Sequence, residues 1–290
     1  TKPVDPAHIE SVMKFAGYGR LDAPYWFLGV EEGIGGNSER ELARLLAVRA
    51  NWGVVMDSHD AHEELEDRFW ARKSVSPAWR SAAKLLLMIK GETDVRASAL
   101  PYVHRKLGRQ SNTEGESLFG ELLPLPKSAE SAWPSEYASA GGYLATGKSY
   151  RLHAIPRRQA MWRSLIRDHQ PNVVFLYGKK NWSYFKGILA ATWNPITVGT
   201  MNAEEATVND GKTIMYCIPH LVPYAGASDD NLKALQIAFQ REHPAHAQRK
   251  HRAFLRKDDP ISSQQHARRH LKCHRLVGEQ RARVLLPRRD

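Results

Sequence analysis

Two adjacent carboxylates stand between an apolar run and a glycine-rich turn in FLGVEEGIGG, residues 27–36. Glu31 and Glu32 lie at the end of a predicted buried strand, and His220, in YCIPHLVPY, follows another such strand. A carboxylate can accept a proton from water or stabilise a cation, and an imidazole can donate to a leaving group. Because parallel sheets bind ligands beyond the carboxyl ends of their strands, we expect both groups in one crevice. The alternative is a solvated turn before a helix at Asn37, with His220 on the surface.

Aromatic residues near the expected crevice can stack on a base. Trp52, in the polar turn RANWG, and Tyr224, just past His220, are the ones that we expect to contact a ligand. Trp79 falls at helical spacing with Leu86, which predicts a position in the core.

The stretch GYLATGKS, residues 142–149, matches the phosphate-loop pattern G-x-x-x-x-G-K-[ST]. That loop needs a strand before it and a helix after it. SAWPSEYASAG is no strand, and Pro156 is expected to interrupt any long helix, so we predict no nucleotide site here. Lys148 and Arg151 can still contact nucleic-acid phosphate from a loop.

Apolar strands alternate with amphipathic helices along the chain. Strands are predicted at residues 25–30, 118–123, 173–177 and 214–218. Helices are predicted at residues 37–48 with a Ser38 and Glu41 capping box, from Ser76 to Gly91, at 161–168, at 181–190 and after Ser228. Residues 92–117 and 126–150 are predicted loops. The order predicts an α/β protein, a three-layer αβα sandwich around a central, mostly parallel four-stranded sheet.

The net charge of +11 is concentrated near the end of the chain. Residues 241–290 carry fourteen Lys or Arg and five Asp or Glu, so they account for nine of the net positive charges. We predict one α/β domain over residues 1–240 and a largely disordered basic tail over 241–290. The tail either adds salt-dependent affinity for phosphates or has no specific role.

Two cysteines, Cys217 and Cys273, are too few for a four-cysteine zinc site or iron-sulfur cluster, and we expect neither metal nor cofactor. Cys217 is predicted to lie in the core. No stretch has the eighteen or more apolar residues of a membrane span, and no secretory signal is apparent at the start, so we expect a cytoplasmic protein.

In this order, the motifs resemble those of the uracil-DNA glycosylase superfamily. Gly29-Val30-Glu31-Glu32-Gly33 is similar to the first family motif, which follows the first core strand. LFGELLPLP is similar to the strand that carries a uracil-pairing asparagine, with Glu121 and Pro124 at the asparagine and proline positions. VVFLYGKKNWSYF is similar to the next strand. His220-Leu221-Val222-Pro223 is similar to the final motif, and Tyr224 stands where the family places a residue that wedges into the duplex.

The resemblance implies that a base is flipped out of DNA and its N-glycosidic bond is cleaved. His220 would donate a hydrogen bond to the departing base, and Glu31 would position or deprotonate water while stabilising the positive sugar. The implied base-binding residues are Gly29, Val30, Glu32, Gly33, Trp52 and Glu121. The implied DNA-binding residues are Lys148, Arg151, Val222, Pro223 and Tyr224. The expected partner of the monomer is DNA containing uracil or other deaminated bases.

Two departures from the family pattern change the expectations. Glu32 replaces a proline, so which carboxylate faces the pocket stays open, and position favours Glu31. An ionised Glu121 would accept from uracil N3–H but repel its O4, so we expect weaker discrimination among bases, extending to deaminated purines. The alternatives are a non-catalytic nucleic-acid-binding protein and a magnesium-dependent nucleotide hydrolase that uses Lys148 and the paired glutamates.

Overall fold

The computed structural model describes residues 4–35, 37–72, 74–110 and 115–242. One compact unit extends to Gln236, and the described residues beyond it belong to the last helix. The predicted tail at 241–290 lies outside the described residues, apart from its first two, and so does Cys273. None of the described helices is both long and apolar enough to span a membrane.

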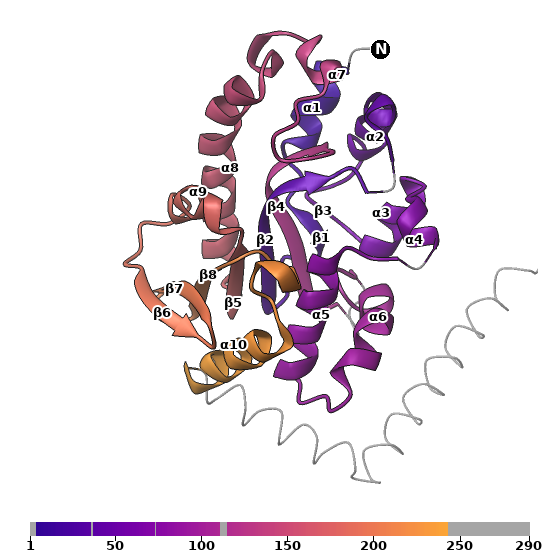
Figure 1. Ribbon diagram of the computed structural model, residues 1–290. Coiled ribbons are helices and arrows are strands. Elements are labelled where there is room, and N and C mark those ends of the chain that lie inside the picture. The colour runs from indigo at the N-terminus through magenta and orange to yellow at the C-terminus, as the bar shows by residue number, and fades with distance from the viewer. Residues whose placement is uncertain (1–3, 36, 73, 111–114, 243–290) are drawn as a thin grey trace, which may run out of the picture. The chain divides into compact units, whose positions relative to one another are not determined.

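Within these residues, eight strands form one sheet with both parallel and antiparallel pairs, in the order β3-β1-β4-β2-β5-β8-β7-β6 (Figure 1). The strands are β1 (Gly17–Gly19), β2 (Tyr25–Gly33), β3 (Val55–Met56), β4 (Ser117–Lys127), β5 (Val173–Tyr177), β6 (Asn194–Val198), β7 (Met201–Val208) and β8 (Thr213–Ile218). The prediction of an α/β protein is confirmed, but the prediction of a four-stranded sheet was wrong. The four predicted strands, β4, β2, β5 and β8, are neighbours and run parallel.

The strands that the sequence pattern missed are short or partly exposed. β1 and β3 have three and two residues, too few to show a period. β6 is largely exposed and contains Pro195, while β7 alternates buried and less buried positions and carries Glu204 and Glu205. Pairing with neighbouring strands, rather than local composition, makes these segments extended.

Ten α-helices and four short 3₁₀ helices fall within the described residues. The α-helices are α1 (Pro6–Val12), α2 (Leu42–Arg49), α3 (Ser58–Glu64), α4 (Arg68–Ala71), α5 (Pro77–Ile89), α6 (Val95–Arg105), α7 (Ser135–Ala138), α8 (Gly147–His169), α9 (Trp182–Lys186) and α10 (Asp229–Glu242). The 3₁₀ helices are η1 (Glu39–Glu41), η2 (Gly142–Leu144), η3 (Lys179–Asn181) and η4 (Pro223–Ala225). The predicted loops are therefore wrong in part, because α6, α7 and the start of α8 lie in them.

Pro156 does not end α8, contrary to the prediction. The helix runs for 23 residues because both of its halves pack into the core, with Tyr150 and Ala154 before the exposed proline and Trp162 after it. Side-chain contacts across the proline compensate for the missing N–H group. Arg158, just after the proline, donates to the main-chain oxygens of Met13, Glu121 and Leu122.

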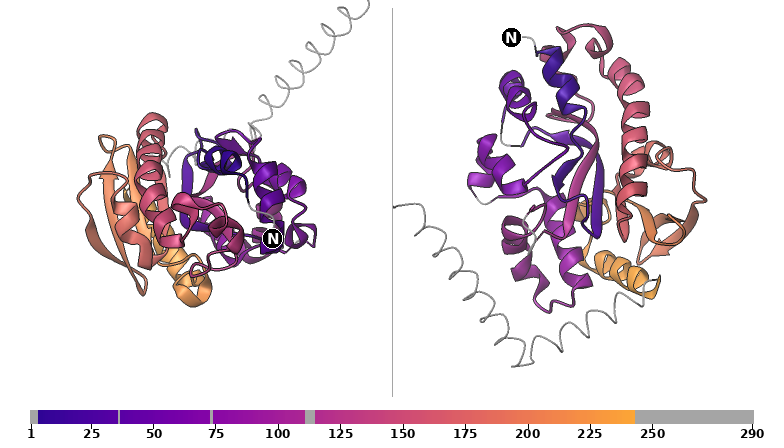
Figure 2. Two further views of the ribbon diagram at one scale, coloured as in Figure 1. Left: turned by 90° about the horizontal axis from the view of Figure 1, so that it is seen from above. Right: turned by 180° about the vertical axis from the view of Figure 1, so that it is seen from behind.

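Helices lie on both faces of the sheet (Figure 2). On one face, Trp162 and other residues of α8, together with α9, pack against apolar residues of the parallel strands. The other face carries stacked rings, with Phe27 5.1 Å from Phe175 and 5.3 Å from Phe119 between ring centroids. Trp79 of α5 packs on Phe119 at 4.8 Å, so α5 approaches this second face.

Strand β4 carries two prolines beyond Gly120, the last residue that pairs with β1. The carbonyl oxygen of Pro124 accepts a hydrogen bond from Arg49 at 3.2 Å, and that of Pro126 accepts one from Tyr137 at 2.8 Å. In an extended strand the nitrogen and oxygen of one residue point to the same side. Both proline nitrogens therefore face the edge of β4 that has no strand partner among the described residues, where no donor is required.

Candidate functional site

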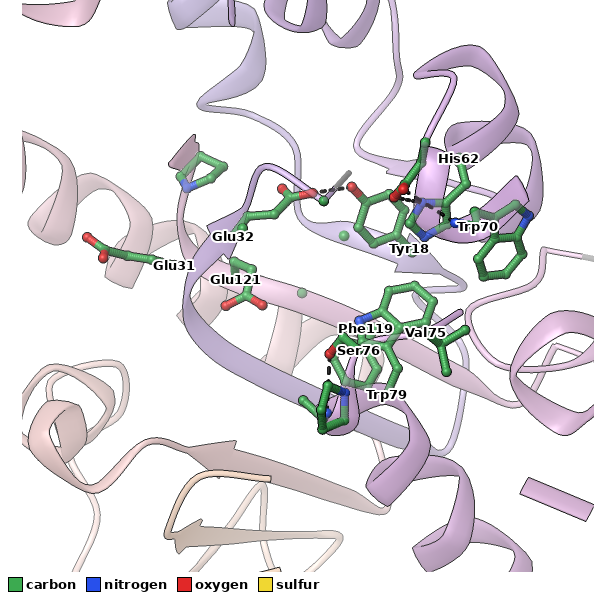
Figure 3. A pocket seen from close by; sticks show the side chains of 18 of the residues that line it. Tyr18, Glu31, Glu32, His62, Trp70, Val75, Ser76, Trp79, Phe119 and Glu121 are labelled. Carbon is green, nitrogen blue, oxygen red and sulfur yellow. Dashed lines mark hydrogen bonds and ion pairs between the residues drawn. The ribbon is translucent and has the colours of Figure 1, made fainter. Parts of the chain in front are cut away.

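A pocket of about 570 Å³ lies at the carboxyl ends of the parallel strands (Figure 3). Its polar wall includes Glu31 and Glu32 of β2, Glu121 of β4, Tyr177 at the end of β5, and His220 just past β8. Parallel strands present their carboxyl ends at one edge of a sheet, which brings these distant residues together. Glu31 and His220 thus both line one pocket.

Glu31 is held by two cations. Its carboxylate is 2.8 Å from Lys127 Nζ and 3.3 Å from Arg151 Nη1, and its side chain is only 6 % exposed. Figure 3 shows Glu31 pointing away from the labelled aromatic side chains. Although Glu31 lines the pocket, each of its oxygens is engaged by a cation and its side chain points away from the aromatic rings, so the geometry does not support the role that position suggested.

Glu32 is the carboxylate that points toward the aromatic side of the pocket (Figure 3). Tyr18 Oη donates to one carboxylate oxygen, and buried Arg49 donates to the other at 2.5 Å. Pairing between β2 and β4 becomes irregular between Glu31 and Gly33, so strand alternation could not decide which glutamate faces inward. Glu32 is an oriented anion whose position is fixed by two donors.

Glu121 lies beside Gly29 on the neighbouring strand. Tyr177 Oη donates to its Oε1 at 3.0 Å, whereas its Oε2 is shielded from solvent and has no hydrogen-bond partner in the part of the chain that the structure describes. Burial, reinforced by the nearby charge of Glu32, raises the pKa of Glu121 well above its ordinary value. The raised pKa favours the protonated form of this side chain, which can both donate and accept a hydrogen bond.

His220 lies at the rim of the pocket and is exposed on one side. Its ring packs edge-on against Tyr177, with 5.6 Å between the centroids and 73° between the planes. Partial burial lowers the pKa of His220, an effect opposed by the charge of Glu130. A largely neutral imidazole therefore stands next to the Glu121–Tyr177 pair at neutral pH.

A second imidazole, His62 of α3, lines the pocket and was not predicted. Its Nδ1 is 3.0 Å from Asp67 Oδ2, and its ring stacks on Trp70 with centroids 4.4 Å apart. A carboxylate on one ring nitrogen orients the other nitrogen for use. SHDAHEELED contains so many acidic and histidine residues that the five-residue spacing of this pair gave no distinctive signal.

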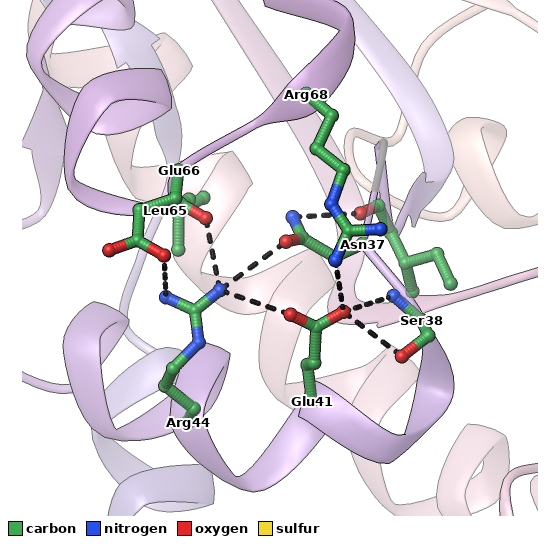
Figure 4. Close-up of polar contacts among 8 residues, drawn as sticks. Asn37, Ser38, Glu41, Arg44, Leu65, Glu66 and Arg68 are labelled. Atoms are coloured by element: carbon green, nitrogen blue, oxygen red, sulfur yellow. Dashed lines mark hydrogen bonds and ion pairs between the residues drawn. The ribbon is translucent and has the colours of Figure 1, made fainter.

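A polar network links the segment after β2 to the helices that carry His62 and Trp70 (Figure 4). Arg44 of α2 donates to Asn37 at 3.3 Å and to the main-chain oxygen of Leu65 at 3.2 Å. The predicted capping box is present, since the Glu41 carboxylate accepts from the main-chain N–H of Ser38 at 2.8 Å. These contacts hold the glutamate-bearing strand end and the aromatic wall in one arrangement.

Trp79 and Trp52 do not lie where the sequence predicted relative to this pocket. Trp79 of α5 lines the pocket, because the pocket lies between α5 and the sheet. Trp52 does not line it and packs behind the pocket wall against Phe15, with centroids 5.4 Å apart, while its Nε1 donates to Glu64 at 2.6 Å. Helical spacing identifies an apolar face but not which part of that face lines a cavity.

The remaining predicted site residues fall into three groups. Gly33 lines the pocket, and Val30 lines two smaller cavities beside it, of about 220 and 380 Å³. Lys148 is exposed at the start of α8, and Thr146 caps this helix by accepting from Ser149 N–H at 3.1 Å. The phosphate-loop match at residues 142–149 is therefore followed by a helix. It begins with the 3₁₀ helix η2, however, and no strand leads into it. Pro223 and Tyr224 are exposed and accessible to DNA. Val222 is buried, so its side chain is not accessible to DNA as predicted.

No protein-family model matches the chain, and no curated protein matches it significantly. Within the described ranges, no group of three or more His, Cys, Asp or Glu side chains is arranged to hold a metal ion. The chemistry of the pocket is therefore the basis of the function proposed below.

Proposed function

We propose that the protein is a DNA glycosylase that takes uracil or another deaminated base into this pocket and hydrolyses its N-glycosidic bond. The observation that carries the proposal is that an oriented anion, Glu32, and a buried carboxyl of raised pKa, Glu121, line one pocket walled by aromatic rings. The volume of about 570 Å³ lies within the range of small-molecule sites, about 300–1,000 Å³. We propose further that the enzyme works in the cytoplasm as a monomer without metal or cofactor.

The fold is compatible with this activity. Four parallel strands at the centre of the sheet, with helices on both faces, agree with the three-layer αβα arrangement that the resemblance to uracil-DNA glycosylases implies. The pocket also lies at the edge of the sheet where that resemblance puts the base. The fold alone does not specify an activity, so the proposal depends on the side chains.

In the proposed reaction, the C1′–N bond breaks and its electron pair leaves with the base. Water adds to C1′, and the proton that it loses passes to Glu32, whose negative charge also stabilises the positive sugar in the transition state. Glu121 and His220 donate hydrogen bonds to the departing base. This assignment moves the water-activating role from Glu31 to Glu32, because Glu32 points toward the aromatic side of the pocket and Glu31 points away from it (Figure 3).

The raised pKa of Glu121, which favours its protonated form, changes the expected base preference. A carboxylic acid presents one donor and one acceptor, as an asparagine amide does, so it can satisfy both N3–H and O4 of uracil. We therefore propose that uracil is favoured over hypoxanthine and xanthine. This replaces the expectation of weak discrimination, which assumed an ionised carboxylate.

The ion pairs of Glu31 favour one alternative. If the carboxylate that the resemblance makes catalytic is neutralised, the chain can keep the pocket and serve as a non-catalytic protein that holds damaged or single-stranded DNA. Such a protein would bind a uracil-containing oligonucleotide without releasing the base.

The test is incubation of the full chain with oligonucleotides containing uracil, hypoxanthine or xanthine in EDTA, followed by alkaline cleavage at abasic sites. We expect cleavage at uracil, and a loss of about 10²–10³ in rate for Glu32→Gln, comparable to the loss of one transition-state contact. Glu31→Gln is the matched control and should keep most of the activity. Binding without cleavage by the wild-type chain would support the non-catalytic alternative, and equal losses in both variants would overturn the assignment of Glu32.

A further inference from the structure

The pocket is walled by aromatic rings from several elements. Trp70 of α4 stacks on His62 at 4.4 Å and 13°, and Trp79 of α5 lies 4.8 Å from Phe119 of β4. Tyr18 of β1 joins these groups, with its ring centroid 6.0 Å from His62 and 5.7 Å from Trp79. Rings of this kind attract a flat ligand, and tryptophan faces attract a cation most strongly.

The charged side chains of the same pocket are of one sign. Its described lining residues include four carboxylates but neither lysine nor arginine, although the whole chain has a net charge of +11. The four are Glu31, Glu32, Asp67 and Glu121. The cations that balance Glu31 and Glu32, namely Lys127, Arg151 and Arg49, do not line the pocket. The pocket therefore disfavours an anionic group and favours a cationic one.

Glu121 has no ion pair with a lysine or arginine among the described residues. One oxygen accepts from Tyr177, and the other, Oε2, is shielded from solvent with no hydrogen-bond partner. Burial and the charge of Glu32 raise its pKa, whereas a counter-charge beside the carboxyl would favour its ionised form. A positively charged ring between the tryptophans and Glu121 would supply that counter-charge.

We infer that the pocket selects a nucleobase that carries a positive charge, an N-alkylated purine or pyrimidine, over a neutral base of the same size. The inference rests on the proposed function for the excision step but not for binding. With a cationic base, the C1′–N bond breaks and the electron pair neutralises the ring, so the base leaves uncharged. Water adds to C1′ and releases a proton to solvent, and no acid is needed to protonate the leaving group.

Two isomeric nucleosides test the ligand class. 1-Methyladenosine is a cation at pH 7.5 and N6-methyladenosine is neutral, yet both carry one extra methyl group. Titration of the full chain, followed by tryptophan fluorescence and calorimetry, should show at least tenfold tighter binding of the cation. Equal affinities, or tighter binding of the neutral isomer, would overturn the inference.

Variants locate the preference in the pocket. Glu121→Gln should bring the ratio of the two affinities close to one, whereas Glu92→Gln, an exposed carboxylate after α5, should leave it unchanged. Trp70→Leu should weaken binding of the cation more than that of the neutral isomer, and it gives a second readout if Glu121→Gln does not fold. An undiminished preference in both pocket variants would place the cation elsewhere and refute the inference.

Excision assays separate this inference from the proposed function. Oligonucleotides with 1-methyladenine and with uracil are incubated in parallel and treated with alkali. Release of uracil without preference for the cationic nucleoside would leave the glycosylase proposal intact and overturn the inference. Preferential binding of the cation with release of neither base would support the inference and overturn the glycosylase proposal.

Discussion

The carboxyl group of Glu121 occupies the space that a side chain on Gly29 would fill. A Cβ atom placed on Gly29 would overlap Glu121 Oε2 and lie 2.5 Å from Tyr177 Oη. The two residues are direct partners on adjacent parallel strands. A glycine on β2 is thus required for the hydrogen bond between Glu121 and Tyr177 to form at the sheet surface.

Gly29→Ala should destabilise the protein by roughly 1–3 kcal/mol, since the added methyl group displaces either Glu121 or Tyr177 in a packed region. Urea unfolding measures the effect. Gly33→Ala, on the same strand, is the control, because among the described residues the nearest atom to its Cβ, the main-chain nitrogen of Gly35, lies 4.0 Å away. That control should stay within about 0.5 kcal/mol of the wild type. Equal effects of the two substitutions would contradict the packing of Glu121 over Gly29.

Glu32→Ala should lower the free energy of unfolding by about 3–5 kcal/mol, because it leaves the guanidinium of Arg49 buried without its anion. The comparison is Glu130→Ala, whose partner Lys180 is 3.9 Å away in an exposed pair. That change should cost less than about 1 kcal/mol. If both variants unfold at the same urea concentration, the Glu32–Arg49 pair is not buried as described.

Glu121→Gln should gain stability relative to the wild type as the pH rises above 4.5. The carboxyl of the unfolded chain ionises near its ordinary pKa of 4.5, while burial keeps the folded group protonated to higher pH. Between these two pKa values, Glu121 is ionised in the unfolded chain but protonated in the folded protein. The free energy of unfolding of the wild type therefore falls as the pH rises, until the pH passes the pKa of the folded protein. Glutamine does not titrate. Urea unfolding of both proteins at pH 4.5, 6.0 and 7.5 gives the difference, and a constant difference would contradict a raised pKa.

Tyr224→Ala should leave stability within about 0.5 kcal/mol of the wild type, because the side chain is 89 % exposed. If the tyrosine inserts into the duplex as the resemblance implies, affinity for a uracil-containing duplex should fall by about one order of magnitude, in line with the loss of one stacking contact. Fluorescence anisotropy of a labelled uracil-containing duplex measures this affinity. Leu152→Ala removes another exposed apolar side chain, 71 % exposed on α8, and should not change DNA affinity.

The parallel centre of the sheet could be predicted because its strands contain nearly uninterrupted apolar runs. VVFLY at β5 is buried at every position, and so is the run at β8. The sheet edges could not be predicted, since β1 contains two glycines in three residues and β6 is largely exposed. Helix α6 was missed because Pro101 lies inside it and its face toward the core contributes few buried residues.

The site was only partly predictable for a related reason. Strand ends located Glu31, Glu32 and His220 at one edge of the sheet, because that follows from parallel pairing. Whether Glu31 or Glu32 faces the pocket depends on the irregular register between β2 and β4. The amino-acid sequence of β2 does not indicate this irregularity. His62 belongs to a short helix whose place beside β1 depends on long-range packing.

The two prolines of β4 have a consequence for the behaviour of the protein at high concentration. An exposed strand edge invites another chain to add a strand, and this is a common origin of aggregation. At Pro124 and Pro126 the edge of β4 is buried and has no N–H to offer, and its carbonyl oxygens already accept from Arg49 and Tyr137. This edge is therefore closed to intermolecular sheet extension beside the pocket.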